Sequence, residues 1–225
     1  MVFAAGLGTR MGKLTRTRPK PLIEVAGRPL LAHALALTRG AGVARTVVNV
    51  HAHPSRMRAW LAAEAPEVTV SEEPALLETG GGLRAALPLL GPGPVLTLNA
   101  DMVWTGANPL RALGAAWDPA RMGALLSLVP RAMATGHAGP GDFFRDSGGR
   151  LIRRGDAATA PYVYAGAQII DPARLPEIPD TVFSLNRLWD LLRAEGRLFG
   201  VVHDGGWCDV GRPEGIALAE AELAR

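Results

Sequence analysis

Apolar and polar positions repeat with two different periods along the first half of the chain. Short apolar runs rich in valine, leucine and alanine, bounded by glycine, proline or polar residues, are typical of buried β-strands. Longer segments with apolar residues at helical spacing separate these runs. The pattern predicts strands at 1–5, 45–50, 67–71 and 94–99, and helices at 30–39, 54–65, 80–90 and 109–117. This alternation indicates an α/β protein with a mostly parallel twisted sheet and helices on both faces, as in Rossmann-like folds.

The pattern changes after residue 122. It predicts strands at 124–129, 162–170 and 198–203, a hairpin formed by 141–145 and 150–153, and helices at 184–195 and 213–223. We therefore expect a small antiparallel lobe laid against the parallel sheet. Neither a linker nor an internal repeat interrupts the chain, so residues 1–225 are predicted to form a single domain.

Composition narrows the classes of function. The chain has 225 residues, 48% of them hydrophobic, which is enough for one full core. A net charge of +3, dispersed arginines and 5% aromatic residues argue against nucleic acid as a partner. The sequence shows neither an apolar run long enough for a membrane span nor a signal peptide. The single cysteine, Cys208, excludes an internal disulfide and predicts a cytoplasmic location.

A loop rich in glycine and basic residues follows the first predicted strand. It begins Gly-Leu-Gly-Thr-Arg at 6–10 and ends Pro-Lys-Pro-Leu at 19–22. Only two of the 24 basic residues of the chain are lysines, Lys13 and Lys20, and both fall in this loop. Glycine amides and cations together favour phosphate binding. The alternative is a solvated basic surface that binds nothing.

Two common phosphate motifs are excluded at this loop. A dinucleotide fingerprint needs a third glycine or alanine where the chain has Met11. A P-loop needs glycine and a hydroxyl residue where the chain has Leu7 and Leu14. The loop therefore belongs to another class of phosphate site.

Two further segments supply carboxylates. Asn99 and Asp101 come at the carboxyl end of a buried strand, where ligands bind in open α/β sheets. Asp209 lies among short apolar residues, where an uncompensated charge would be costly. Carboxylates beside a phosphate cradle can hold Mg²⁺. The alternatives are an Asp101 that caps the following turn and an Asp209 that caps the last helix.

Two glycine-rich stretches are candidates for contacts with a flat ligand and a sugar. Residues 78–82, Glu-Thr-Gly-Gly-Gly, open a predicted helix and could offer free N–H groups, or form a turn with Thr79 as the N-cap. Asp142 could accept hydrogen bonds from hydroxyl groups, or shape a turn. His51 and His53 have no supporting metal ligands in the sequence and are taken as ordinary loop residues.

These motifs together resemble sugar-1-phosphate nucleotidylyltransferases. The opening segment 5–10 with 19–22, Asn-Ala-Asp at 99–101 and Trp-Cys-Asp-Val-Gly at 207–211 are similar to motifs of that family and come in the same order. Segments 77–82, 86–90 and 141–143 are most similar to members that use UTP and N-acetylmuramate 1-phosphate. The resemblance covers nearly the whole chain.

The resemblance implies a role for each segment. Residues 1–122 would form the nucleotide-binding half, 123–206 mainly the sugar-binding lobe, and 207–225 the second metal carboxylate with a closing helix. Arg10, Lys20 and Asp101 would be catalytic, and Asp101 and Asp209 would hold Mg²⁺. Nucleotide contacts would come from Ala5, Gly6, Gly8, Thr9, Arg10, Lys20, Glu78, Gly80, Gly81 and Asn99, and sugar contacts from Asp142 and Gly166.

The implied activity is transfer of a nucleoside monophosphate from UTP to a sugar 1-phosphate, best matched by N-acetylmuramate 1-phosphate in cell-wall recycling, with release of pyrophosphate. Rival substrate pairs are GTP with mannose 1-phosphate and UTP with glucose 1-phosphate. A rival of another class is a non-catalytic regulatory subunit that binds nucleotide. We expect a monomer or weak dimer, with no nucleic-acid or membrane partner.

Overall fold

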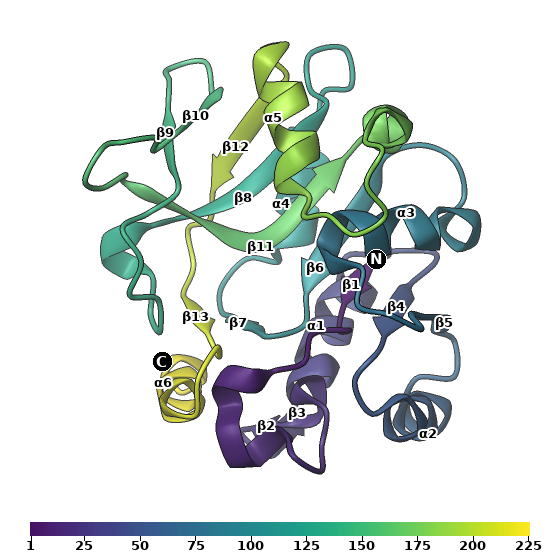
Figure 1. Cartoon of the computed structure of the whole chain (residues 1–225). Helices are drawn as coiled ribbons and strands as arrows, with labels where there is room; N and C mark the ends of the chain where they lie inside the picture. The colour runs from purple at the N-terminus through teal and green to yellow at the C-terminus, as the bar shows by residue number, and fades with distance from the viewer.

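One large twisted sheet runs through the computed structural model, which describes residues 1–225 (Figure 1). Its nine strands are β1 (Val2–Phe3), β4 (Val47–Val50), β5 (Thr69–Glu72), β6 (Val95–Asn99), β8 (Ala124–Pro130), β9 (Phe143–Arg145), β10 (Leu151–Arg153), β11 (Tyr162–Ile170) and β12 (Leu198–Val202). Strands β5, β4, β1 and β6 are adjacent and parallel. Strand β11 is antiparallel to both β6 and β8, and β12 is parallel to β8.

The second half of the chain extends the sheet of the first half. Residues Ala167–Ile170 of β11 pair with Val95–Leu98 of β6, so the predicted fold class is confirmed, and the antiparallel part joins the parallel sheet edge to edge. An unpaired edge at β6 would leave its amides and carbonyls without partners, and β11 supplies them. The antiparallel additions are small: the β9–β10 hairpin, and the pairs β2 (Glu24–Val25) with β3 (Arg28–Pro29) and β7 (Met102–Trp104) with β13 (Trp207–Asp209).

Helices cover both faces of the sheet, as the alternation predicts. They are α1 (Leu30–Gly40), α2 (Pro54–Glu64), α3 (Glu78–Leu90), α4 (Pro109–Ala116), α5 (Asn186–Ala194) and α6 (Glu214–Leu223), with 3₁₀ turns at Thr9–Thr15, Lys20–Leu22, Arg131–Met133 and Pro172–Glu177. Each face of the sheet has its own hydrophobic core, because successive strand residues point to opposite faces. Val48 belongs to the core with α1, α2 and α4, whereas Val47 belongs to the core with α3 and α5. None of the helices combines the length and apolar character needed to cross a membrane.

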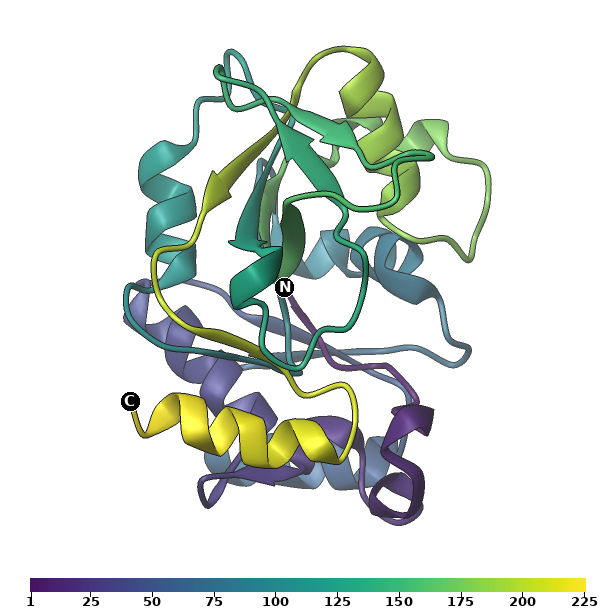
Figure 2. The same cartoon turned by 90° about the vertical axis from the view of Figure 1, so that its left-hand side faces the viewer.

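A third, smaller core holds the end of the chain against its beginning. Helix α6 contributes Ala219, the 3₁₀ turn after β1 contributes Met11, and β7 and β13 contribute Val103 and Cys208. Figure 2 shows α6 crossing below the sheet beside the N-terminal segment. This packing joins the basic loop to the second carboxylate segment.

Candidate active site

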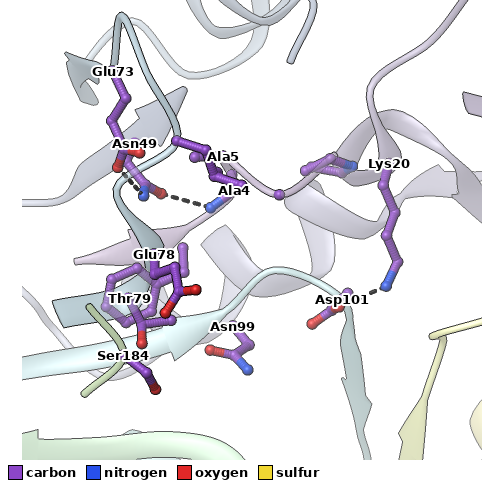
Figure 3. A pocket seen from close by; sticks show the side chains of 14 residues that line it. Ala4, Ala5, Lys20, Asn49, Glu73, Glu78, Thr79, Asn99, Asp101 and Ser184 are labelled. Atoms are coloured by element: carbon purple, nitrogen blue, oxygen red, sulfur yellow. Dashed lines mark hydrogen bonds and ion pairs between the residues drawn. The ribbon is translucent and has the colours of Figure 1, made fainter. Parts of the chain in front are cut away.

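A cavity of about 350 Å³ lies at the carboxyl ends of β1, β4 and β6 (Figure 3). This is the edge where open α/β sheets bind ligands. The cavity is lined by residues from six separate stretches of the chain: Phe3, Ala4, Ala5, Gly6, Lys20, Pro21, Asn49, Glu73, Leu76, Glu78, Thr79, Asn99, Asp101 and Ser184. The structure therefore brings the predicted loop, helix start and strand end to one place.

Lys20 reaches into this cavity from the basic loop. Its Nζ donates to Asp101 Oδ2 at 2.6 Å, and its side chain is only 9% exposed. Gly8 makes this placement possible: its φ is +63°, and a Cβ there would lie 2.8 Å from Lys20 Cβ. A solvated surface loop is thus the wrong description of this lysine, since folding fixes it beside a carboxylate.

The pairing of β7 with β13 brings Asp101 and Asp209 together. Asp209 lies opposite Met102, and the Val210 amide donates to the Asp101 carbonyl oxygen at 3.0 Å. Burial and the Asp101 carboxylate raise the pKa of Asp209, while Lys20 and Arg10 lower it. Four charged groups therefore surround one point: two carboxylates and two cations.

Neither carboxylate serves as a cap. Asp101 accepts its side-chain hydrogen bond from Lys20, and α6 begins after Pro213 without a side-chain cap. Asp209 Oδ1 is buried and has no hydrogen-bond partner in the protein. An orphaned carboxylate oxygen next to a second carboxylate suits a divalent cation with oxygen ligands. No group of three His, Cys, Asp or Glu side chains is present, so phosphate or water oxygens would have to complete such a shell.

A buried polar network on the other side of the cavity was not predicted. The Ala4 amide donates to Asn49 Oδ1 at 2.7 Å, and Asn49 Nδ2 donates to Glu73 Oε1 at 2.7 Å. Glu73 Oε2 accepts from the Leu77 amide at 3.1 Å, which fixes the approach to α3. The one sequence signal was Asn49, a polar residue within an apolar strand; nothing marked Glu73.

The start of α3 differs from the prediction in two respects. The amides of Gly80 and Gly81 both donate to the Phe183 carbonyl oxygen, at 2.8 and 3.1 Å, so they are not free for a ligand. Thr79 is not an N-cap, because its Oγ1 accepts from the Leu185 amide instead. Glu78 and Thr79 line the cavity, and first-turn amides have no intrahelical acceptor. Any backbone contact with a base thus falls to these two residues.

Replacing Gly80 with alanine is expected to destabilise the protein by about 1–3 kcal/mol, because overpacking displaces neighbours. A Cβ at this position would lie 2.3 Å from the Phe183 ring. Urea unfolding would measure the change. Gly114→Ala is the matched control: this helical glycine is exposed with open space around it, and alanine there should stabilise by about 0.5–1 kcal/mol. Equal stability of G80A and wild type would contradict the packing argument.

A second cavity of about 240 Å³ continues from the first and shares Phe3, Thr79, Asn99 and Ser184 with it. Its remaining lining comes mainly from β9–β11 and α5: Asp142, Phe143, Arg153, Tyr164, Gln168, Leu185, Asn186 and Trp189. Asp142 lines this cavity and shapes no local turn, since its Oδ2 accepts from the distant Tyr164 amide of β11 at 2.8 Å.

Gly166 does not line either cavity. It has a φ of +86° in the irregular middle of β11, and a Cβ there would lie 3.2 Å from Asn99 Cβ. Gly166 therefore packs against Asn99, which lines both cavities, without lining either one itself. The imidazoles of His51 and His53 each form a hydrogen bond with a backbone carbonyl oxygen, of Glu73 and Thr15 respectively.

Known proteins resemble this chain along its whole length. Residues 1–137 match the MobA-like NTP transferase domain family. The N-acetylmuramate alpha-1-phosphate uridylyltransferase of Caulobacter vibrioides is 45% identical, with 100% of this chain and 96% of that protein covered. The protein of the same name from Neisseria meningitidis is 35% identical, with 94% and 92% covered.

Among solved structures, HddC from Yersinia pseudotuberculosis, complexed with GMP-PN, superimposes with a TM-score of 0.79. The match covers 99% of this chain and 97% of HddC at 19% identity, which shows a common fold. The likeness to HddC shows the fold alone, whereas the two uridylyltransferases, matched over nearly their whole length, also show the family. The chain belongs to the MobA-like NTP transferases and, among them, to the sugar-1-phosphate nucleotidylyltransferases.

Proposed function

We propose that this enzyme transfers uridine monophosphate from UTP to N-acetylmuramate 1-phosphate. The observation that carries the proposal is the Lys20–Asp101 pair, 2.6 Å long, placed in a cavity that opens directly into a second one. Nucleotide in the first cavity, which Lys20 lines, and sugar in the second would meet near Asn99 and Thr79, which line both. The similarity to the Caulobacter and Neisseria uridylyltransferases supports the choice of substrates.

The reaction needs alignment more than proton transfer. An oxygen of the sugar phosphate attacks the α-phosphorus of UTP, a new P–O bond forms, and the bond to pyrophosphate breaks. The attacking oxygen is already ionised at neutral pH, so no general base is required. The site accordingly offers cations, backbone amides and carboxylates, which act by positioning and charge neutralisation.

The basic loop is proposed to hold the phosphates. Gly8, Thr9 and Arg10 would bind the triphosphate, with exposed Arg10 on the leaving pyrophosphate. Lys20 would release Asp101 and bridge the α-phosphate and the sugar phosphate. Its ammonium is a compact charge, which suits a position between two phosphate groups.

Asp101 and Asp209 are proposed to hold Mg²⁺. When bound, the cation would neutralise phosphate charge and polarise phosphoryl oxygens. The fit rests on the orphaned, buried Oδ1 of Asp209 and on the neighbouring Asp101. Without a cation these two carboxylates repel each other, and Lys20 and Arg10 compensate them only in part.

The rest of the first cavity is proposed to bind uridine. Ala5 and Gly6 would follow the phosphates, Asn99 would contact the nucleotide, and Glu78 and Thr79 would meet the base. Gly80 and Gly81 act through shape, because they let the Phe183 segment pack on the helix. Asp142 is proposed to accept hydrogen bonds from hydroxyl groups of the sugar in the second cavity. Gly166 is proposed to act indirectly, by packing against Asn99.

The substrate pair is tested by steady-state kinetics with a matrix of triphosphates and sugar 1-phosphates, read as pyrophosphate release. We expect the highest kcat/KM for UTP with N-acetylmuramate 1-phosphate, because a base of the wrong shape leaves buried polar groups unpaired. A higher value for GTP with mannose 1-phosphate or for UTP with glucose 1-phosphate would overturn the choice of substrates and leave the chemistry intact.

The same assay separates an enzyme from a nucleotide-binding regulatory subunit, which would bind UTP without releasing pyrophosphate. Retention of Lys20 and both carboxylates in one cluster favours the enzyme. A cytoplasmic location, supported by a single free and buried thiol, and a monomeric or weakly dimeric state complete the proposal.

A further inference from the structure

The second cavity contains one guanidinium group. Four arginines lie on or beside the β9–β10 hairpin, and only Arg153 lines the cavity. Arg145 instead donates through Nε to the Gly200 carbonyl oxygen at 2.8 Å, and Arg154 donates to the Ala157 carbonyl oxygen at 2.7 Å. Arg150 donates through Nε to the Gly196 carbonyl oxygen at 3.2 Å. The structure thus separates one cavity-facing arginine from three that bond to backbone carbonyls.

Several neighbours orient the Arg153 side chain. Its Nε donates to Asp190 at 3.1 Å, and its Nη1 and Nη2 donate to the side chain and backbone of Asn186 at 2.8 and 3.3 Å. The guanidinium carbon lies 5.1 Å from the centre of the Phe143 ring and 5.4 Å from that of Trp189. These contacts use three of its five N–H groups, so two remain for a ligand.

The charge of Arg153 is not cancelled by Asp190. The Asp190 carboxylate is half exposed, and its Oδ1 also lies 3.7 Å from Arg193 Nε. Two guanidinium groups therefore share one solvated carboxylate, which is a weak pairing. The one carboxylate that lines the cavity, Asp142, is bonded through Oδ2 to the Tyr164 amide.

A second unsatisfied donor lies in the same cavity. Gln168 is fully buried, and its Oε1 accepts from Trp189 Nε1 at 2.8 Å. Its Nε2 is buried without a hydrogen-bond partner. Buried donors without partners are rare in folded proteins and indicate an acceptor supplied from outside. The cavity therefore offers a cation and an amide donor to an electronegative ligand.

We infer that Arg153 binds a carboxylate carried by the sugar and thereby selects an acidic amino sugar phosphate over its neutral counterpart. This inference rests on the proposed function and deepens it. N-acetylmuramate carries such a carboxylate on its lactyl ether, whereas N-acetylglucosamine is the same sugar without it. A preordered guanidinium loses little freedom on binding, so the charge-assisted bond favours the acidic sugar.

The test compares N-acetylmuramate 1-phosphate with N-acetylglucosamine 1-phosphate, each with UTP. In Arg153→Gln, kcat/KM for the acidic sugar should fall roughly 10- to 100-fold, mainly through KM, because a charge-assisted hydrogen bond is lost. The value for the neutral sugar should change little. Arg153→Lys should lie between, since it keeps the charge but not the planar fork. Arg145→Gln is the matched control and should leave the ratio of the two sugars unchanged.

An Arg153→Gln variant with the wild-type ratio of kcat/KM for the two sugars would overturn the inference, whether or not both values fall. Should the variant fail to fold, the methyl ester of the lactyl group replaces it. Wild-type enzyme should then have a lower kcat/KM for the ester than for the free acid. Equal kcat/KM values for acid and ester would overturn the inference. Absence of pyrophosphate with either sugar would instead defeat the proposed activity itself, whereas equal wild-type kcat/KM values for the two sugars would defeat the role of Arg153 and the choice of sugar, and leave the transfer reaction intact.

Discussion

Lys20→Ala is expected to lower kcat by about 100- to 1,000-fold, because it removes a preorganised charge at the reacting phosphates. Lys20→Arg should also be slow, since a broad guanidinium does not fit where Gly8 packs against the lysine stem. Pyrophosphate release at saturating substrates measures both effects. The fold should persist, because the lysine belongs to a 3₁₀ turn outside the main sheet.

Lys13 provides the control for this substitution. It lies in the same loop, is exposed and makes no ion pair with a carboxylate. Lys13→Ala should therefore leave kcat close to that of wild type. If Lys20→Ala turned over normally while Lys13→Ala did not, the assignment of the phosphate-binding lysine would be wrong.

The two carboxylates are expected to behave as a unit. Asp101→Asn and Asp209→Asn should each abolish turnover or raise the Mg²⁺ concentration required, and the double variant should be little worse than either single one, because both serve one ion. Titration of activity with MgCl₂ measures the requirement. Asp204→Asn is the control, since Asp204 is exposed and precedes the same strand. Additive losses would contradict a shared cation.

Asp209→Asn should at the same time stabilise the metal-free protein by roughly 0.5–2 kcal/mol, as replacements of strained functional groups often do. Burial and Asp101 raise the pKa of Asp209, which means that its ionised form is costly in the folded state. Urea unfolding in EDTA measures the effect. A less stable Asp209→Asn variant would show that the carboxylate is a structural group, against a role in metal binding.

The sequence predicted the parts of the site that depend on local pattern. Alternating strands and helices, the glycine-rich loop and the carboxylates at strand ends have short-range signatures, and the structure places Lys20, Asn99 and Asp101 in one cavity. The β7–β13 pair was missed because each strand has only three residues. Without the family resemblance, no local pattern could have shown that Asp209 lies beside Asp101, because their proximity depends on that long-range pairing.

Other features depend on tertiary packing that no local pattern reveals. The amides of Gly80 and Gly81 donate their hydrogen bonds to the carbonyl oxygen of Phe183, which is distant in sequence. Glu73 looks like an ordinary surface residue until Asn49 and the Leu77 amide surround it. Arg153 differs from Arg145 and Arg154 only in its direction, which the hairpin register and α5 decide.

A short strand pair, apart from the large sheet, keeps the two carboxylates together. Every strand of the nine-stranded sheet ends by Val202, whereas Asp209 is carried by β13, which follows it and pairs with β7. The large sheet therefore does not need β13 for its strand pairing, whereas the carboxylate pair does. Local opening costs less free energy than global unfolding, so loosening of β13 from β7 would part the two carboxylates and leave the sheet intact. The charge cluster is thus a part of the enzyme that can be lost on its own, while a nucleotide still has a place to bind.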